Sequence, residues 1–118
     1  MDHSEVLAAE RTRALAQIAS LTGDLEEMIA ASASSNADDE HDPEGATIAF
    51  ERAQVSALLA QAHRRLADVE HALGQVRDGG YGRCLTCGEP IGAERLAARP
   101  ASRTCICCAS RSAGERRP

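Results

Sequence analysis

The sequence has almost no aromatic residues: among its 118 residues there is no Trp, one Tyr (Tyr81) and one Phe (Phe50). Aromatic side chains usually supply much of the apolar area that a small core buries, so this scarcity excludes a compact core of the ordinary kind. Lys is also absent, and all 13 basic residues are Arg. The abundant residues are Ala, Leu, Arg and Glu, a composition typical of helices.

Long apolar runs are absent too. None approaches the roughly 20 residues of a membrane-spanning helix. Asp2 and Glu5 stand at the start of the chain, where a secretory signal would carry basic and then apolar residues. We therefore expect no membrane partner. Five cysteines, four of them at metal-ligand spacing, suit a reducing compartment, and we expect a cytoplasmic protein.

The net charge of -5 hides a difference between the two ends of the chain. Residues 1–50 hold 11 acidic residues against two Arg, whereas residues 51–118 hold 11 Arg against seven acidic residues. Nucleic-acid binding rests mainly on neutralising phosphates, so the acidic total predicts no direct sequence-specific DNA binding. The Arg-bearing C-terminal part still has the charge to meet an acidic protein surface or a phosphate.

Two apolar stripes predict two long helices. In each stripe the steps alternate between four and three residues, which is the coiled-coil period, and Arg11 alone interrupts the apolar pattern. The first stripe is Leu7, Arg11, Ala14, Ile18, Leu21, Leu25 and Met28, and the second is Val55, Leu59, Ala62, Leu66, Val69, Leu73 and Val76.

The residues between the stripes have loop chemistry, with Ser, Asn, Asp and Glu predominating. Asp42 has the type of an N-cap residue, and Pro43 suits the first helical position, where its missing N–H costs nothing. Gly79-Gly80 is a typical helix end. The sequence therefore predicts two helices that flank an acidic loop at about residues 32–45.

The lengths of these helices favour a hairpin. Each has about 30 residues and would extend roughly 45 Å. Similar lengths, one stripe each and a short connection favour an antiparallel coiled-coil hairpin over residues 1–78. The alternative is that the same stripes join two chains in a dimer.

Four cysteines near the C-terminus predict one Zn²⁺ ion. Cys84, Cys87, Cys105 and Cys108 form C-x2-C-x17-C-x2-C, a spacing typical of four-thiolate zinc sites. Each CxxC pair can bring two thiolates to a tetrahedral ion from one tight turn, and Gly88 gives the first turn the backbone freedom it needs. Four thiolates leave no open position, so the ion would be structural.

The predicted fold class is therefore mainly α: a long helical hairpin followed by a small four-cysteine zinc finger at residues 79–110. Residues 111–118 would form a short Arg-containing tail. Cys107 is left over, because its use as a ligand would shorten the second pair to CxC. It is either a spare thiol or a redox-active one. The alternative for the whole set is a group of unrelated redox cysteines.

The finger resembles a known family. Residues 81–91 read YGRCLTCGEPI and residues 95–100 read RLAARP before the second CxxC pair. This pattern is similar to the zinc finger of the DksA/TraR family, over about residues 79–108. The resemblance implies a bacterial transcription regulator that binds RNA polymerase directly. It also implies that the coiled coil enters the secondary channel of the polymerase and brings an acidic tip near the catalytic magnesium.

The resemblance gives candidate effector residues at the tip: Asp39, Asp42 and Glu44. The best-known family pattern is D-x-x-D-x-A. Asp39 and Asp42 supply its aspartate pair, with Glu44 in place of Ala. A register that starts at Asp42 instead puts Gly45 where the second aspartate belongs. The alternative is a solvated acidic loop without a role.

The C-terminus departs from part of the family. Members that respond to guanosine tetraphosphate carry a longer C-terminal helix, whereas ten residues follow Cys108 here. The sequence therefore does not support dependence on guanosine tetraphosphate. The competing hypotheses are an adaptor that binds another protein through the coiled coil, and a DNA-binding finger that uses its Arg residues. No phosphate-binding glycine loop or nucleophile–base motif is readable, so we expect no enzyme.

Overall fold

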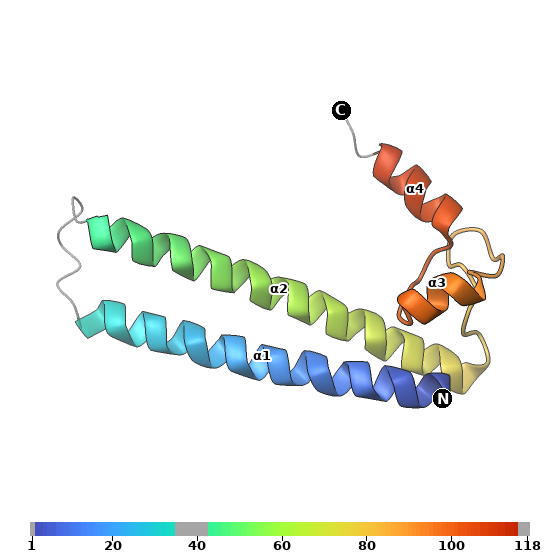
Figure 1. The fold of residues 1–118 in the computed structure, drawn as a ribbon, viewed down its shortest axis with the longest axis horizontal. Coiled ribbons are helices and arrows are strands. Elements are labelled where there is room, and N and C mark those ends of the chain that lie inside the picture. Colours follow the sequence, from blue (N-terminus) through green and yellow to red (C-terminus); the bar gives the residue numbers. More distant parts are fainter. Residues whose placement is uncertain (1, 35–42, 116–118) are drawn as a thin grey trace. The chain divides into compact units, whose positions relative to one another are not determined.

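The computed structural model describes residues 2–34 and 43–115, and these are mainly α-helical. The chain forms α1 (His3–Ser34), α2 (Pro43–Asp78), α3 (Ala93–Ala98) and α4 (Ile106–Glu115) in that order (Figure 1). Extended structure in this part of the chain is limited to one isolated bridge between Arg83 and Pro90. None of the described helices is long and apolar enough to cross a membrane.

The predicted helical hairpin is confirmed. The chain divides into two compact units, Met1–Thr12 with Leu66–Pro118, and Arg13–Arg65. Both long helices run through both units, and within each unit they lie side by side in opposite directions (Figure 1). In the first unit Leu7 packs in one cluster with Val69 and Ala72. In the second, Arg65 Nη1 donates a hydrogen bond to Gln17 Oε1 at 2.9 Å.

The apolar stripes are the faces along which α1 and α2 meet. Every stripe position except Arg11 is buried or half-buried. Leu7 in the first unit is fully buried at 0% exposure, and Ala14 and Ala62 in the second are 1% exposed. The coiled-coil period therefore identified the buried face correctly.

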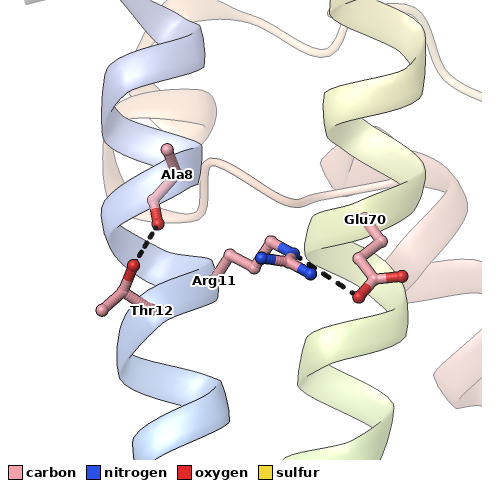
Figure 2. A network of polar contacts seen from close by, with 4 residues as sticks. All are labelled: Ala8, Arg11, Thr12 and Glu70. Carbon is pink, nitrogen blue, oxygen red and sulfur yellow. Dashed lines mark hydrogen bonds and ion pairs between the residues drawn. The ribbon is translucent and has the colours of Figure 1, made fainter.

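Arg11, the one polar residue in the stripes, is exposed and forms an ion pair across the two helices. Its Nε lies 3.6 Å from Oε1 of Glu70, and both side chains are about half exposed, at 47% and 52% (Figure 2). An exposed pair of this kind contributes only about 0–1 kcal/mol. The hydroxyl group of Thr12, the next residue, donates a hydrogen bond within α1 to the carbonyl oxygen of Ala8 at 3.1 Å (Figure 2).

Glycine ends α2 as expected. Gly79 has a φ of +84°, in the left-handed region that favours glycine. The Gly80 amide donates to the carbonyl oxygen of Gln75 at 2.9 Å, which is the Schellman arrangement. At the other end of α2, Pro43 occupies the first helical position. α1 extends to Ser34, so the helices include both margins of the segment expected as loop.

Candidate metal centre

A tight turn presents the first cysteine pair. The Cys84 amide donates to Glu89 O at 2.8 Å, and the Gly88 amide donates to Cys84 O at 2.9 Å. Gly88 closes this turn with a φ of +77°, a conformation that strains most other residues. The turn is narrow enough to bring the Cys84 and Cys87 side chains to the same side.

The second pair lies at the start of α4. Cys105 immediately precedes the helix, and its carbonyl oxygen accepts the Ala109 amide at 2.9 Å. Cys108 follows in the first turn of α4, on the same face as Cys105 because three residues make nearly one turn. The sequence predicts a tail after residue 110, whereas in the structure α4 continues to Glu115. The helix-forming residues that follow Cys108 are the signal for it.

The structure brings together the four thiols that the spacing singles out. The Sγ atoms of Cys84, Cys87, Cys105 and Cys108 all lie within 4.8 Å of one another, and those of Cys87 and Cys105 are 3.9 Å apart. A tetrahedral Zn²⁺ ion with Zn–S bonds of about 2.3 Å requires neighbouring sulfurs at about 3.8 Å. The cluster therefore fits such an ion, whereas a disulfide would need a separation of about 2 Å.

Electrostatics divides the four thiols into two kinds. Hydrogen bonds from the backbone amides of Cys105, Cys87 and Thr86, the first being the largest cause, lower the pKa of Cys84 to about 6 against the opposing effect of burial. The backbone amide of Cys108 likewise lowers the pKa of Cys105. The neighbouring Cys105 thiol, with burial, raises the pKa of Cys108 to about 12. The pKa of Cys87 is also raised: the Glu89 amide favours its thiolate, but the Cys84 side chain and burial outweigh that effect.

The pKa shifts are opposed, downward at Cys84 and Cys105 and upward at Cys87 and Cys108, because four thiols are packed this closely. A divalent cation among them supplies the positive charge that lets all four become thiolates. The arrangement is that of a closed structural site, because four sulfurs fill a tetrahedral coordination sphere.

A small apolar core surrounds the cluster. Cys84 and Cys108 are 2% and 5% exposed and pack with Ile91, which is 6% exposed. Leu96 of α3 packs against the same group, and a Cβ at Gly82 would lie 3.5 Å from its Cδ1 atom. α3 was not predicted from the sequence. Its signal is the run of helix formers after Gly92 that ends just before Pro100.

Cys107 lies outside the cluster and its side chain is exposed. This agrees with the expectation that Cys107 is not a zinc ligand. The tip residues Asp39 and Asp42 lie outside the described residues. Glu44 belongs to the first turn of α2, but its side chain is likewise outside the described part.

Comparisons with known proteins agree with the site. Residues 79–112 match the family model described as the prokaryotic dksA/traR C4-type zinc finger. YteA of Bacillus subtilis is 38% identical over 66 residues, which are 56% of this chain and 28% of that protein. The RNA polymerase-binding transcription factor DksA of Caulobacter vibrioides is 51% identical over 35 residues, which are 30% of this chain and 25% of that protein.

The chain thus spans about a quarter of the length of the curated relatives it matches. A solved structure matches it far more extensively. The transcription factor DksA2 of Pseudomonas aeruginosa has a TM-score of 0.75 and 26% sequence identity, over 98% of this chain and 84% of that one. The family match and the fit of the four thiols together show that the finger holds one structural zinc ion.

Proposed function

Because this chain belongs to the DksA/TraR family of C4-type zinc-finger proteins, we propose that it is a transcription regulator that binds bacterial RNA polymerase directly. The observation that carries the proposal is the structural likeness to the transcription factor DksA2, which covers both long helices and the finger. The C. vibrioides relative, named as an RNA polymerase-binding transcription factor, supports the same partner. A polymerase partner also implies the cytoplasm.

We assign different roles to the hairpin and to the finger. The hairpin of residues 1–78 is the part that enters the secondary channel, and the finger of residues 79–110 is its base, with Cys84, Cys87, Cys105 and Cys108 as the zinc ligands. A closed zinc site offers no position for a substrate, so the protein would act by binding and not by catalysis.

The tip would be the effector. Asp39, Asp42 and Glu44 would come near the catalytic magnesium of the polymerase, where added carboxylates change the local charge and can compete for metal coordination. Support for this step is the family resemblance and the acidic sequence between the two helices.

Binding to polymerase is the first test. We expect the zinc-loaded protein to bind bacterial core RNA polymerase at about micromolar concentration or below, and a transcript-cleavage factor that occupies the secondary channel to displace it. Fluorescence anisotropy of a labelled protein measures both. Binding that the cleavage factor does not displace would argue against the secondary channel. Absence of binding would argue against the function itself.

The tip makes a separate prediction. The double variant Asp39→Asn and Asp42→Asn should bind polymerase with the wild-type Kd but lose most of its effect on in vitro transcription. The matched control is Glu26→Gln with Glu27→Gln, which removes two exposed carboxylates from α1 and should retain the wild-type effect. An unchanged transcriptional effect in the tip variant would mean that this segment is only a linker.

An adaptor is the second candidate function. Three large apolar side chains on α2 are exposed, Ile48 at 37%, Phe50 at 65% and Leu58 at 45%, and exposed apolar groups of this size favour contact with another protein. Pull-down with the Phe50→Ala variant separates the candidates: an adaptor should lose its partner, whereas polymerase binding through the channel should not depend on one such residue.

A further inference from the structure

The five residues just before Cys105, residues 100–104, are held by three different elements. Tyr81 Oη donates to Pro100 O at 2.8 Å, and the Leu85 amide donates to Arg103 O at 2.9 Å. Arg95 Nε of α3 donates to Thr104 O at 2.9 Å. The path of residues 100–104 is therefore set by the first cysteine turn, by α3 and by the residues just after α2.

Side chains of the same five residues contact α2. The Arg103 Nε atom lies 2.8 Å from Asp68 Oδ1, and Arg103 Nη2 donates to Ala67 O at 3.4 Å. Ala101 packs against the buried cluster that Val69 of α2 belongs to. Arg103 thus connects two elements: its carbonyl oxygen accepts a hydrogen bond from the first cysteine turn, and its guanidinium group contacts α2.

The contact between this segment and α2 is incompletely satisfied. Within the described residues, the buried side-chain nitrogen and oxygen atoms without a hydrogen-bond partner are His71 Nε2, Ser102 Oγ and Arg103 Nε. The last lies close to the Asp68 carboxylate without the alignment of a hydrogen bond. His71 follows Ala67 and Asp68 by one helical turn, so it lies on the same face of α2. These unpaired atoms would regain hydrogen bonds to water if the contact opened. The contact is therefore stabilised mainly by the Arg103–Asp68 ion pair and by the packing of Ala101.

We infer that Arg103 is a positioning residue that couples zinc binding in the finger to the packing of the finger against α2. With all four thiolates bound to zinc, the first cysteine turn keeps its shape, and its Leu85 amide keeps the Arg103 backbone in place. Without zinc that turn is free to change, and Arg103 leaves Asp68. The coupling concerns this chain alone, so it does not rest on polymerase binding.

Hydrogen–deuterium exchange of the full-length protein tests the coupling. In the wild type, removing zinc with a chelator under reducing conditions should speed exchange of amides 66–74 about fivefold, the size expected from one exposed ion pair. Zinc-loaded Arg103→Ala should show the same faster exchange while still binding one zinc per chain. Arg103→Lys should recover part of the protection. Arg99→Ala, an exposed arginine next to the same segment, should match the wild type.

A second variant tests the coupling if Arg103→Ala unfolds the finger. Should Arg103→Ala fail to hold zinc, Asp68→Asn decides, because Asp68 lies on α2, outside the finger, and its carboxylate pairs with Arg103. Zinc-loaded Asp68→Asn is expected to show the fast exchange of amides 66–74. The exchanged pair Asp68→Arg with Arg103→Asp should restore protection. Slow exchange in Asp68→Asn, or in the chelated wild type, would overturn the coupling.

Discussion

Cys84→Ser should lose its zinc and unfold residues 79–112 while α1 and α2 remain helical. Cys84 is only 2% exposed, and hydrogen bonds, chiefly from the Cys105 amide, lower the pKa of its thiol to about 6. Its loss removes one of four thiolates from the site. In a segment this small, metal ligation supplies folding free energy that the few apolar residues cannot.

Metal analysis and far-UV circular dichroism measure the two parts of this prediction. Zinc content should fall from about one ion per chain to near zero after dialysis. α3 and α4 have 6 and 10 residues, against 32 and 36 in α1 and α2, so most of the helical signal should persist. Cys107→Ser is the matched control and should keep its zinc. Full zinc content in Cys84→Ser would refute its assignment as a ligand.

Leu7→Ala should lower the free energy of unfolding by about 2–5 kcal/mol. Leu7 is 0% exposed and packs with Val69 and Ala72 of α2. The substitution removes most of a buried side chain and leaves a cavity that two helices cannot easily close. Urea unfolding of the zinc-loaded protein, followed by circular dichroism, measures the change. Because the same cluster contacts Tyr81 and Ala101, local exchange near the finger should also rise.

The control for Leu7 is Leu15, a residue of the same type on the same helix. Leu15 is 39% exposed, so Leu15→Ala should cost less than about 1 kcal/mol. An equal loss in the two variants would mean that stability in α1 reflects helix propensity and not burial at the stripe.

The long helices were predictable because their signal is repeated. A stripe of seven positions fixes which face of each helix is buried, and one polar exception such as Arg11 does not obscure it. The end of α2 was predictable for another reason: few residues other than glycine adopt the φ of Gly79. The clustering of the four cysteines was predictable because two CxxC pairs have the spacing typical of tetrahedral thiolate sites.

The rest depends on contacts between residues distant in sequence. α3 is too short for a periodic pattern, and its position depends on Leu96 packing near the cysteines. No local feature of Arg103 indicates that it reaches Asp68, 35 residues earlier in the sequence. The scarcity of aromatic residues predicted the absence of a large aromatic core. In the described part of the chain the largest fully buried side chains are Leu7 and Val69, and Phe50 is exposed.

The single tyrosine gives this protein an internal optical reporter. Tyr81 donates its hydroxyl to Pro100 O, its ring centroid lies 4.7 Å from that of His3, and burial raises the pKa of its phenol. Because there is no Trp to accept its excitation energy, all tyrosine fluorescence comes from this one place. The emission intensity of Tyr81 therefore reports on the packing of α1, the end of α2 and the segment before Cys105 around this ring, without any attached label.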